Sequence, residues 1–184
     1  MESLLATNEI VQRKVQTKDW RKSQSWYVNG KSNECENYQK KLIIAITGKS
    51  IGGSTYMRIN TNTHELKKFS NNKIPHGTEE EQDDWGYWTE DFDGQEEKNN
   101  KKLFYNLKFV CEEGGAQRRT LRELHHFIHA QNDVIKNPEY SNVYFINILD
   151  GKLCEDYKNC FRKFKDPRCF IGSMYEFQHW YRQI

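Results

Sequence analysis

Two glycines followed by a run of arginines form the best functional signal in this sequence. Gly114 and Gly115 precede the segment Gln117-Arg118-Arg119-Thr120-Leu121-Arg122, which begins an apolar pattern with helical spacing. Glycines before a helix let backbone N–H groups approach an anion, and the helix dipole favours negative charge there. Arginines in the first turns add charge-assisted hydrogen bonds to phosphate. The residues predicted to contact a nucleic-acid backbone are Gln117, Arg118, Arg119 and Arg122. The competing interpretation pairs these arginines with nearby acidic residues.

Acidic residues and a lysine come shortly before this helix in the chain. The sequence Asp91-Phe92-Asp93-Gly94 precedes an alternating apolar segment that contains Asn106-Leu107-Lys108. Residues two apart on a strand point to the same side, so Asn106 and Lys108 are expected to face one pocket. With the helix that follows, this order resembles the core of the PD-(D/E)XK nucleases, the restriction-endonuclease-like superfamily. The resemblance covers about 60 residues, from Asp91 to Leu149.

The resemblance implies metal-dependent cleavage of a phosphodiester bond. In that superfamily an Asp at the end of one strand and an acid-x-Lys on the next hold magnesium and a water over the scissile phosphate. Carboxylates bind the hard cation, while the Lys stabilises developing charge and lowers the pKa of the water. By this resemblance Asp93, or Asp91, binds Mg²⁺ or Mn²⁺, and Lys108 positions and polarises the water.

The sequence departs from the superfamily's pattern at Asn106, which stands where the usual acid would be. Asn supplies one neutral oxygen and no charge, which weakens magnesium binding. Some members of the superfamily carry that acid on the following helix, and Glu123 lies 15 residues after Lys108 on the predicted helix. Glu112 and Glu113 are the next candidates. The expected catalytic residues are Asp93, Lys108, Asn106 and Glu123, and the expected metal ligands are Asp93, Asp91, Glu123 and Glu112.

These residues lead to the hypothesis of a DNA endonuclease that uses a divalent metal, with RNA kept as an alternative substrate. Cutting both strands is simplest with two-fold symmetry, so a homodimer is one expected arrangement, although the sequence itself specifies none. The alternative function is a non-catalytic nucleic-acid-binding or assembly protein with a degenerate nuclease fold, as Asn106 suggests. A third hypothesis is a protein–protein adaptor anchored by its aromatic tail, which contains Tyr175, Phe177, Trp180 and Tyr181.

Hydrophobic patterning predicts the elements that would position these residues. A continuous apolar run at 41–47 and an alternating segment at 54–60 predict a strand hairpin, and 71–100 is expected to be an acidic loop. The other predicted strands lie at 26–28, 102–110, 143–149 and near 169–171, and the predicted helices at 117–136 and 154–164. The strands at 41–47, 54–60, 102–110 and 143–149 should share one sheet, with the 117–136 helix packed on it.

The expected fold class is therefore α/β: a single mixed β-sheet flanked by helices, with a restriction-endonuclease-like core. An N-terminal arm or helix at 1–25 precedes one domain at 26–184, into which the acidic loop 76–97 is inserted. That loop has ten Asp or Glu and no Lys or Arg, whereas residues 1–75 carry 13 Lys or Arg against six acids. A solvated loop is the competing interpretation of this acidic run.

Composition excludes several classes of protein. Aromatic residues make up 14% of the 184, which is too many for a disordered chain. No apolar stretch approaches the roughly 18 residues of a membrane span, so no membrane partner is expected. The N-terminal segment lacks the apolar core of a secretory signal, and five cysteines at irregular spacings do not indicate a disulfide framework. We therefore expect an intracellular protein of the cytoplasm or nucleus that is not secreted.

Overall fold

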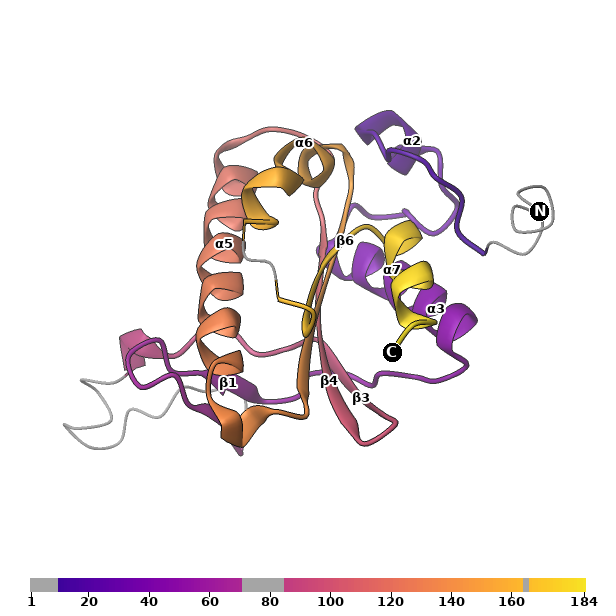
Figure 1. Ribbon diagram of the computed structural model, residues 1–184. Coiled ribbons are helices and arrows are strands. Elements are labelled where there is room, and N and C mark those ends of the chain that lie inside the picture. Colours follow the sequence, from indigo (N-terminus) through magenta and orange to yellow (C-terminus); the bar gives the residue numbers. More distant parts are fainter. Residues whose placement is uncertain (1–9, 71–84, 164–165) are drawn as a thin grey trace.

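A four-stranded mixed sheet lies at the centre of the computed structural model, which describes residues 10–70, 85–163 and 166–184 (Figure 1). The strand order is β3-β4-β5-β6, with β3 antiparallel to β4 and the other neighbours parallel. The strands are β3 (Gly94–Lys98), β4 (Lys101–Phe109), β5 (Val143–Asp150) and β6 (Cys169–Gly172). Because β4 and β5 are parallel, their carboxyl ends lie at the same edge of the sheet.

Helices cover both faces of this sheet, giving three layers (Figure 1). Helices α5 (Gly115–Ile135) and α6 (Lys152–Phe161) lie on one face, and α3 (Ser32–Thr47) and α7 (Met174–Tyr181) lie on the other. The smaller elements are α2 (Lys18–Lys22), the hairpin of β1 (Met57–Ile59) and β2 (Leu66–Lys68), and the 3₁₀ turns η1 (Trp85–Tyr87) and η2 (Pro138–Tyr140). Two hydrophobic cores, one on each face, hold the layers together.

Strand β4 contributes to both cores because its side chains alternate. Leu103, Tyr105 and Leu107 are buried against the α3 and α7 layer. Phe104 is buried in the other core, among residues of α5 and β5. This two-sided burial is typical of a central strand in a parallel or mixed sheet. The strand predicted at 102–110 is therefore confirmed, and so is its position in one sheet with the 143–149 strand.

The strand predicted at 41–47 is wrong, because these residues form the second half of α3. Burial follows a helical period: Cys35, Gln39 and Ile43 are buried at four-residue intervals, whereas Ile44 is 46% exposed. Gly48 ends the helix with φ of 75°, a left-handed conformation that glycine adopts without steric cost. The continuous apolar run therefore lies along a helix of which only one side is buried.

Other predictions in this half of the chain also need correction. The segment 54–60 contributes only β1, which pairs with β2 and not with 41–47. Residues 26–28 form turns and bends without a strand. The expected loop at 71–100 contains β3, while its residues 71–84 lie outside the described part. Strand β3 escaped detection because Glu96, a charged residue, occupies a buried position in its alternating pattern.

The second half of the chain agrees with prediction. Helices expected at 117–136 and 154–164 correspond to α5 and α6, and the strand near 169–171 corresponds to β6. The chain is thus an α/β protein with a mixed four-stranded sheet, packed helices and a small hairpin. The arm expected at 1–25 contains the short helix α2, and residues 1–9 are outside the described part. Within the described ranges, no helix is long and apolar enough to cross a membrane.

Candidate functional site

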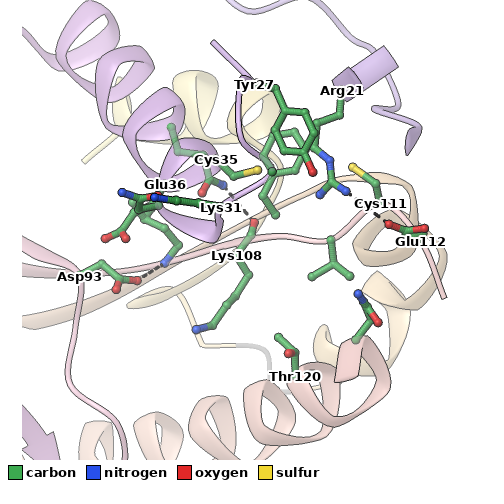
Figure 2. Close-up of a pocket in the computed structure, with 17 residues that line it drawn as sticks. Arg21, Tyr27, Lys31, Cys35, Glu36, Asp93, Lys108, Cys111, Glu112 and Thr120 are labelled. Atoms are coloured by element: carbon green, nitrogen blue, oxygen red, sulfur yellow. Dashed lines mark hydrogen bonds and ion pairs between the residues drawn. The ribbon is translucent and has the colours of Figure 1, made fainter. Parts of the chain in front are cut away.

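A pocket of about 540 Å³ lies at the carboxyl end of β4, between α3 and the first turns of α5 (Figure 2). Charged side chains of both signs line each of its two ends. Glu36 of α3 and Asp93, directly before β3, lie near the Lys108 side chain at one end, as Figure 2 shows. Arg21, beside Cys111 and Glu112, lines the other end. The pocket thus combines carboxylates, which suit a cation, with cationic groups, which suit an anion.

Asp93 is held at the pocket by strand β4. Its Oδ2 accepts a hydrogen bond from the Leu107 backbone N–H at 2.7 Å, and its own N–H donates to the Tyr105 carbonyl at 2.8 Å. The pKa of the Asp93 carboxyl is raised to about 6, mainly by burial and also by the carboxylates of Glu36 and Glu90, against the opposing effects of the Leu107 hydrogen bond and of Lys108. Three carboxylates and one ammonium group therefore influence each other here, an arrangement that a bound cation would stabilise.

Lys108 is fixed through both its side chain and its backbone. Its Nζ lies 3.4 Å from a Glu90 carboxylate oxygen, and its side chain is 21% exposed. Its carbonyl accepts a hydrogen bond from Gln39 Nε2 at 3.0 Å, and the same amide donates to Asp150 Oδ2 at 3.0 Å. Asp150, buried at the end of β5, also accepts from the Met174 N–H at 3.0 Å. These contacts join α3, β4, β5 and α7 directly behind Lys108.

Asn106 lies in the core and not at the pocket. It is 1% exposed and its Nδ2 donates to Asn147 Oδ1 at 2.9 Å, an oxygen that also accepts from Gln131 Nε2 at 3.0 Å. Asn147 in turn donates to Gln131 Oε1 at 2.7 Å. The expectation that Asn106 and Lys108 face one pocket is not met, because Asn106 is committed to an amide cluster joining β4, β5 and α5. Its role in this structure is to satisfy buried polar groups.

The other expected metal ligands are dispersed. Asp91 Oδ2 accepts a hydrogen bond from the Ser54 hydroxyl, away from the pocket. Glu123 is exposed on α5 and does not line the pocket. Glu112 lines the end that carries Arg21, where an ion pair with Lys18 at 2.6 Å lowers the pKa of the Glu112 carboxyl. Of the four expected ligands, the structure brings only Asp93 to Lys108.

The first turns of α5, which are predicted to bind phosphate, also lie apart from most of this pocket. Arg118, Arg119 and Arg122 are exposed on α5, and Arg118 lies 3.4 Å from Glu113. Only Gln117 of the four predicted contacts lines the pocket. The positive charges that line it are Arg21, Lys31 and Lys108.

Sequence reasoning missed Glu36 and Gln39, which α3 places at the pocket. The detectable signal was the four-residue spacing of Cys35, Gln39 and Ile43 ahead of Gly48, which indicates a helix with a buried side. On such a helix Glu36 and Gln39 are three residues apart and therefore neighbours. The apolar run at 41–47 concealed this pattern.

The carboxylates of the pocket suit a magnesium ion whose remaining ligands are waters and substrate phosphates. Among the residues placed by the structure, no three His, Cys, Asp or Glu side chains are grouped so as to hold a metal. Magnesium, however, keeps several waters and is usually bound by one or two carboxylates together with substrate phosphates. Glu36 and Asp93 supply that number of carboxylates at the Lys108 end of the pocket.

The fold and the pocket together define an α/β protein with a carboxylate-and-lysine site at the edge of a mixed sheet. No protein-family model, curated protein or solved structure matches this chain. The chemistry of the pocket is therefore the guide to the function of this protein.

Proposed function

We propose that this protein is a divalent-metal-dependent nuclease that hydrolyses phosphodiester bonds in DNA. The observation that carries the proposal is the meeting of Asp93 and Lys108 in one pocket, from adjacent antiparallel strands, beside Glu36. The order of elements supports it as well, since β3, β4, α5 and the parallel β5 follow the sequence of the PD-(D/E)XK core that this chain resembles. In this proposal Glu36 supplies the carboxylate that the PD-(D/E)XK pattern has where this chain has Asn106.

Each side chain then has a defined task. Glu36 and Asp93 would hold Mg²⁺ or Mn²⁺, which supplies positive charge at a phosphate oxygen and lowers the pKa of a water. Lys108 stabilises the negative charge that develops on the phosphate, and its half-buried environment strengthens that interaction. Gln39 orients the Lys108 backbone through the carbonyl hydrogen bond. Glu90 neutralises Lys108 until substrate is bound.

A second candidate function is nucleic-acid binding without catalysis. The observation that favours it is Asn106, which replaces the usual acid and is locked by hydrogen bonds into the core. The Lys108–Glu90 ion pair is compatible with this alternative too, because it neutralises the candidate catalytic cation. In that case the pocket would bind a nucleic-acid phosphate and leave it intact.

Plasmid cleavage in Mg²⁺, Mn²⁺ or a chelator distinguishes the two functions. We expect metal-dependent cleavage that Asp93→Ala, Glu36→Gln and Lys108→Met each reduce by at least about 100-fold. Excess Mn²⁺ should partly restore the first two variants, which lose a metal ligand, but not the third. Glu123→Gln is the matched control for Glu36→Gln and should keep full activity, because Glu123 does not line the pocket. Binding without cleavage in every metal would contradict the nuclease proposal and favour the second function.

The same assay tests the proposed homodimer. A monomer with one site cuts one strand per encounter, so nicked plasmid accumulates before linear plasmid appears. A dimer with two-fold symmetry produces linear plasmid directly. RNA of matched sequence serves as the substrate comparison.

A further inference from the structure

Arg21 occupies an unusual position at the end of the pocket away from Lys108. Its side chain is only 12% exposed, and within the described part of the chain its buried Nε has no hydrogen-bond partner. Its guanidinium carbon lies 4.9 Å from the centre of the Tyr27 ring, and its Nη2 is 3.5 Å from Glu112 Oε1. A buried guanidinium with an unsatisfied donor is costly unless a further acceptor completes it.

Aromatic stacking fixes this arginine relative to the proposed catalytic lysine. The Trp20 ring, next to Arg21 in α2, stacks on Phe109 with ring centroids 6.4 Å apart. Phe109 directly follows Lys108 in β4. Trp26 stacks on Tyr38 of α3 at 4.3 Å, and both rings also contact Phe109 edge-on. The N-terminal arm is therefore attached to the same strand end that carries Lys108.

Glu112, the ion-pair partner of Arg21, also forms an ion pair with Lys18. Glu112 makes its shorter ion pair with Lys18, at 2.6 Å, and its longer one with Arg21, at 3.5 Å. If Arg21 turned toward another anion, Lys18 would keep Glu112 neutralised, so the exchange would leave no buried charge unpaired. The guanidinium is suited to phosphate because its donors match the phosphate oxygens in pairs.

We propose that Arg21, together with Lys31, which also lines the pocket, binds a backbone phosphate of the DNA strand whose neighbouring phosphate lies at Asp93 and Lys108. This inference rests on the proposed function and specifies how that site holds its substrate. It assigns substrate positioning to α2 and to the residue that precedes α3, whereas the sequence analysis predicts the α5 arginines for this role. Arg21 and Lys31 both line the pocket, whereas Arg118, Arg119 and Arg122 do not.

The test measures binding separately from cleavage. A fluorescent DNA duplex is titrated with the full chain in chelator, so that no hydrolysis occurs, over a range of salt concentrations. Arg21→Gln should weaken binding about tenfold and reduce the slope of log K against log[salt] by about one. Arg182→Gln removes the same charge from an exposed position beyond α7 and should change affinity less than twofold.

A second variant keeps the proposal falsifiable if Arg21→Gln fails to fold. Glu112→Gln removes the residue that competes with DNA for Arg21 and should raise affinity about threefold at low salt. In the double variant Arg21→Gln/Glu112→Gln that gain should be lost, because the two residues act on one phosphate. An unchanged affinity in Glu112→Gln would overturn the proposal, since a purely structural ion pair affects stability and not binding.

The outcomes separate this inference from the proposed function. If the wild type binds and cuts DNA while Arg21→Gln binds equally well, the Arg21 site is wrong and the nuclease stands. If the wild type binds without cutting and Arg21→Gln binds about tenfold more weakly, the nuclease is wrong and the Arg21 site stands. Absence of binding even at low salt overturns both.

Discussion

The amide of Asn106 connects the two central strands β4 and β5 through a buried hydrogen bond to Asn147. Its acceptor, Asn147 Oδ1, also receives the Gln131 amide, and all three side chains are at most 1% exposed. Such a network is favourable only while each donor faces an acceptor. The chemistry of Asn106 is therefore set by its partners in the core.

Asn106→Asp is expected to destabilise the protein without creating activity. The new carboxylate would face Asn147 Oδ1. Two hydrogen-bond acceptors would then lie against each other, and a negative charge would be buried. We expect a loss of about 2–4 kcal/mol in urea-induced unfolding at neutral pH, partly recovered at acidic pH where the carboxyl is protonated. Asn142→Asp, at an exposed position before β5, is the control and should change stability by less than about 0.5 kcal/mol. Unchanged stability of Asn106→Asp would contradict this account of the cluster.

At the scale of residues, four of the predicted site residues line the pocket: Asp93, Lys108, Glu112 and Gln117. Asp93 and Lys108 were paired in advance only through the resemblance to the PD-(D/E)XK core, because the strand that follows Asp93 was not predicted. Glu36 could not be placed with them, because nothing near it in the sequence signals that α3 would lie against β4. Arg21 escaped for the same reason: its place depends on aromatic contacts between distant segments.

At the scale of elements, the N-terminal arm packs against α7, the start of α6 and the carboxyl end of β4. Gln178 of α7, fully buried, donates to the Val11 carbonyl at 2.7 Å and accepts from the Val11 N–H at 3.2 Å. Further along, the Gln16 carbonyl accepts from the Lys152 N–H at 2.7 Å, at the start of α6. The Gly151 N–H also donates to Gln16 Oε1 at 3.1 Å, so hydrogen bonds at Val11 and Gln16 fasten this segment to α7 and to the start of α6.

Gln178→Leu should release the beginning of this arm while the sheet stays folded. The substitution keeps the size of the side chain but leaves both Val11 backbone groups without partners. We expect a loss of about 1–2 kcal/mol and much faster hydrogen exchange at the Val11 amide, with amides of β4 and β5 still protected. Gln183→Leu, at an exposed position after α7, is the comparison and should leave exchange at Val11 unchanged. Equal protection of Val11 in wild type and Gln178→Leu would show that other contacts hold the arm.

Prediction missed α3 and β3 for different reasons. Helix α3 was mistaken for a strand in its apolar half because periodicity over seven residues cannot distinguish a buried strand from one side of a helix. Strand β3 was overlooked because Glu96 is buried there, where it accepts hydrogen bonds from the hydroxyls of Tyr105, at 2.7 Å, and of Tyr181. The α5, β5 and α6 segments have simple patterns and were predicted correctly.

At the scale of the whole molecule, the stability of the fold depends on carboxyl groups that are buried near the pocket. Burial raises the pKa of Asp93 and of Asp150 to about 6, against 3.8 for the ordinary side chain. The folded state therefore binds these protons more tightly than the unfolded chain does. Their contribution to stability is complete below about pH 4 and is lost as the pH rises through about 6. We attribute the tolerance of this loss at neutral pH to the proposed role of the Asp93 carboxylate as a metal ligand.

Asp93→Asn should therefore stabilise the protein at neutral pH while it abolishes metal-dependent cleavage. The Asn oxygen can still accept the Leu107 N–H bond, but no charge is buried. We expect the variant to gain about 1–2 kcal/mol over wild type in unfolding at pH 7.5, and no advantage at pH 3.5, where the wild-type carboxyl is also neutral. Millimolar Mg²⁺ should reduce the difference by stabilising the wild type alone, whereas NaCl of equal ionic strength should not. Asp150→Asn is the contrasting variant. Its side-chain NH₂ group would face the Gln39 amide donor, so we expect this variant to be less stable than the wild type at every pH. A constant difference between Asp93→Asn and wild type from pH 3.5 to 7.5 would refute the raised pKa and, with it, the electrostatic basis of the metal site.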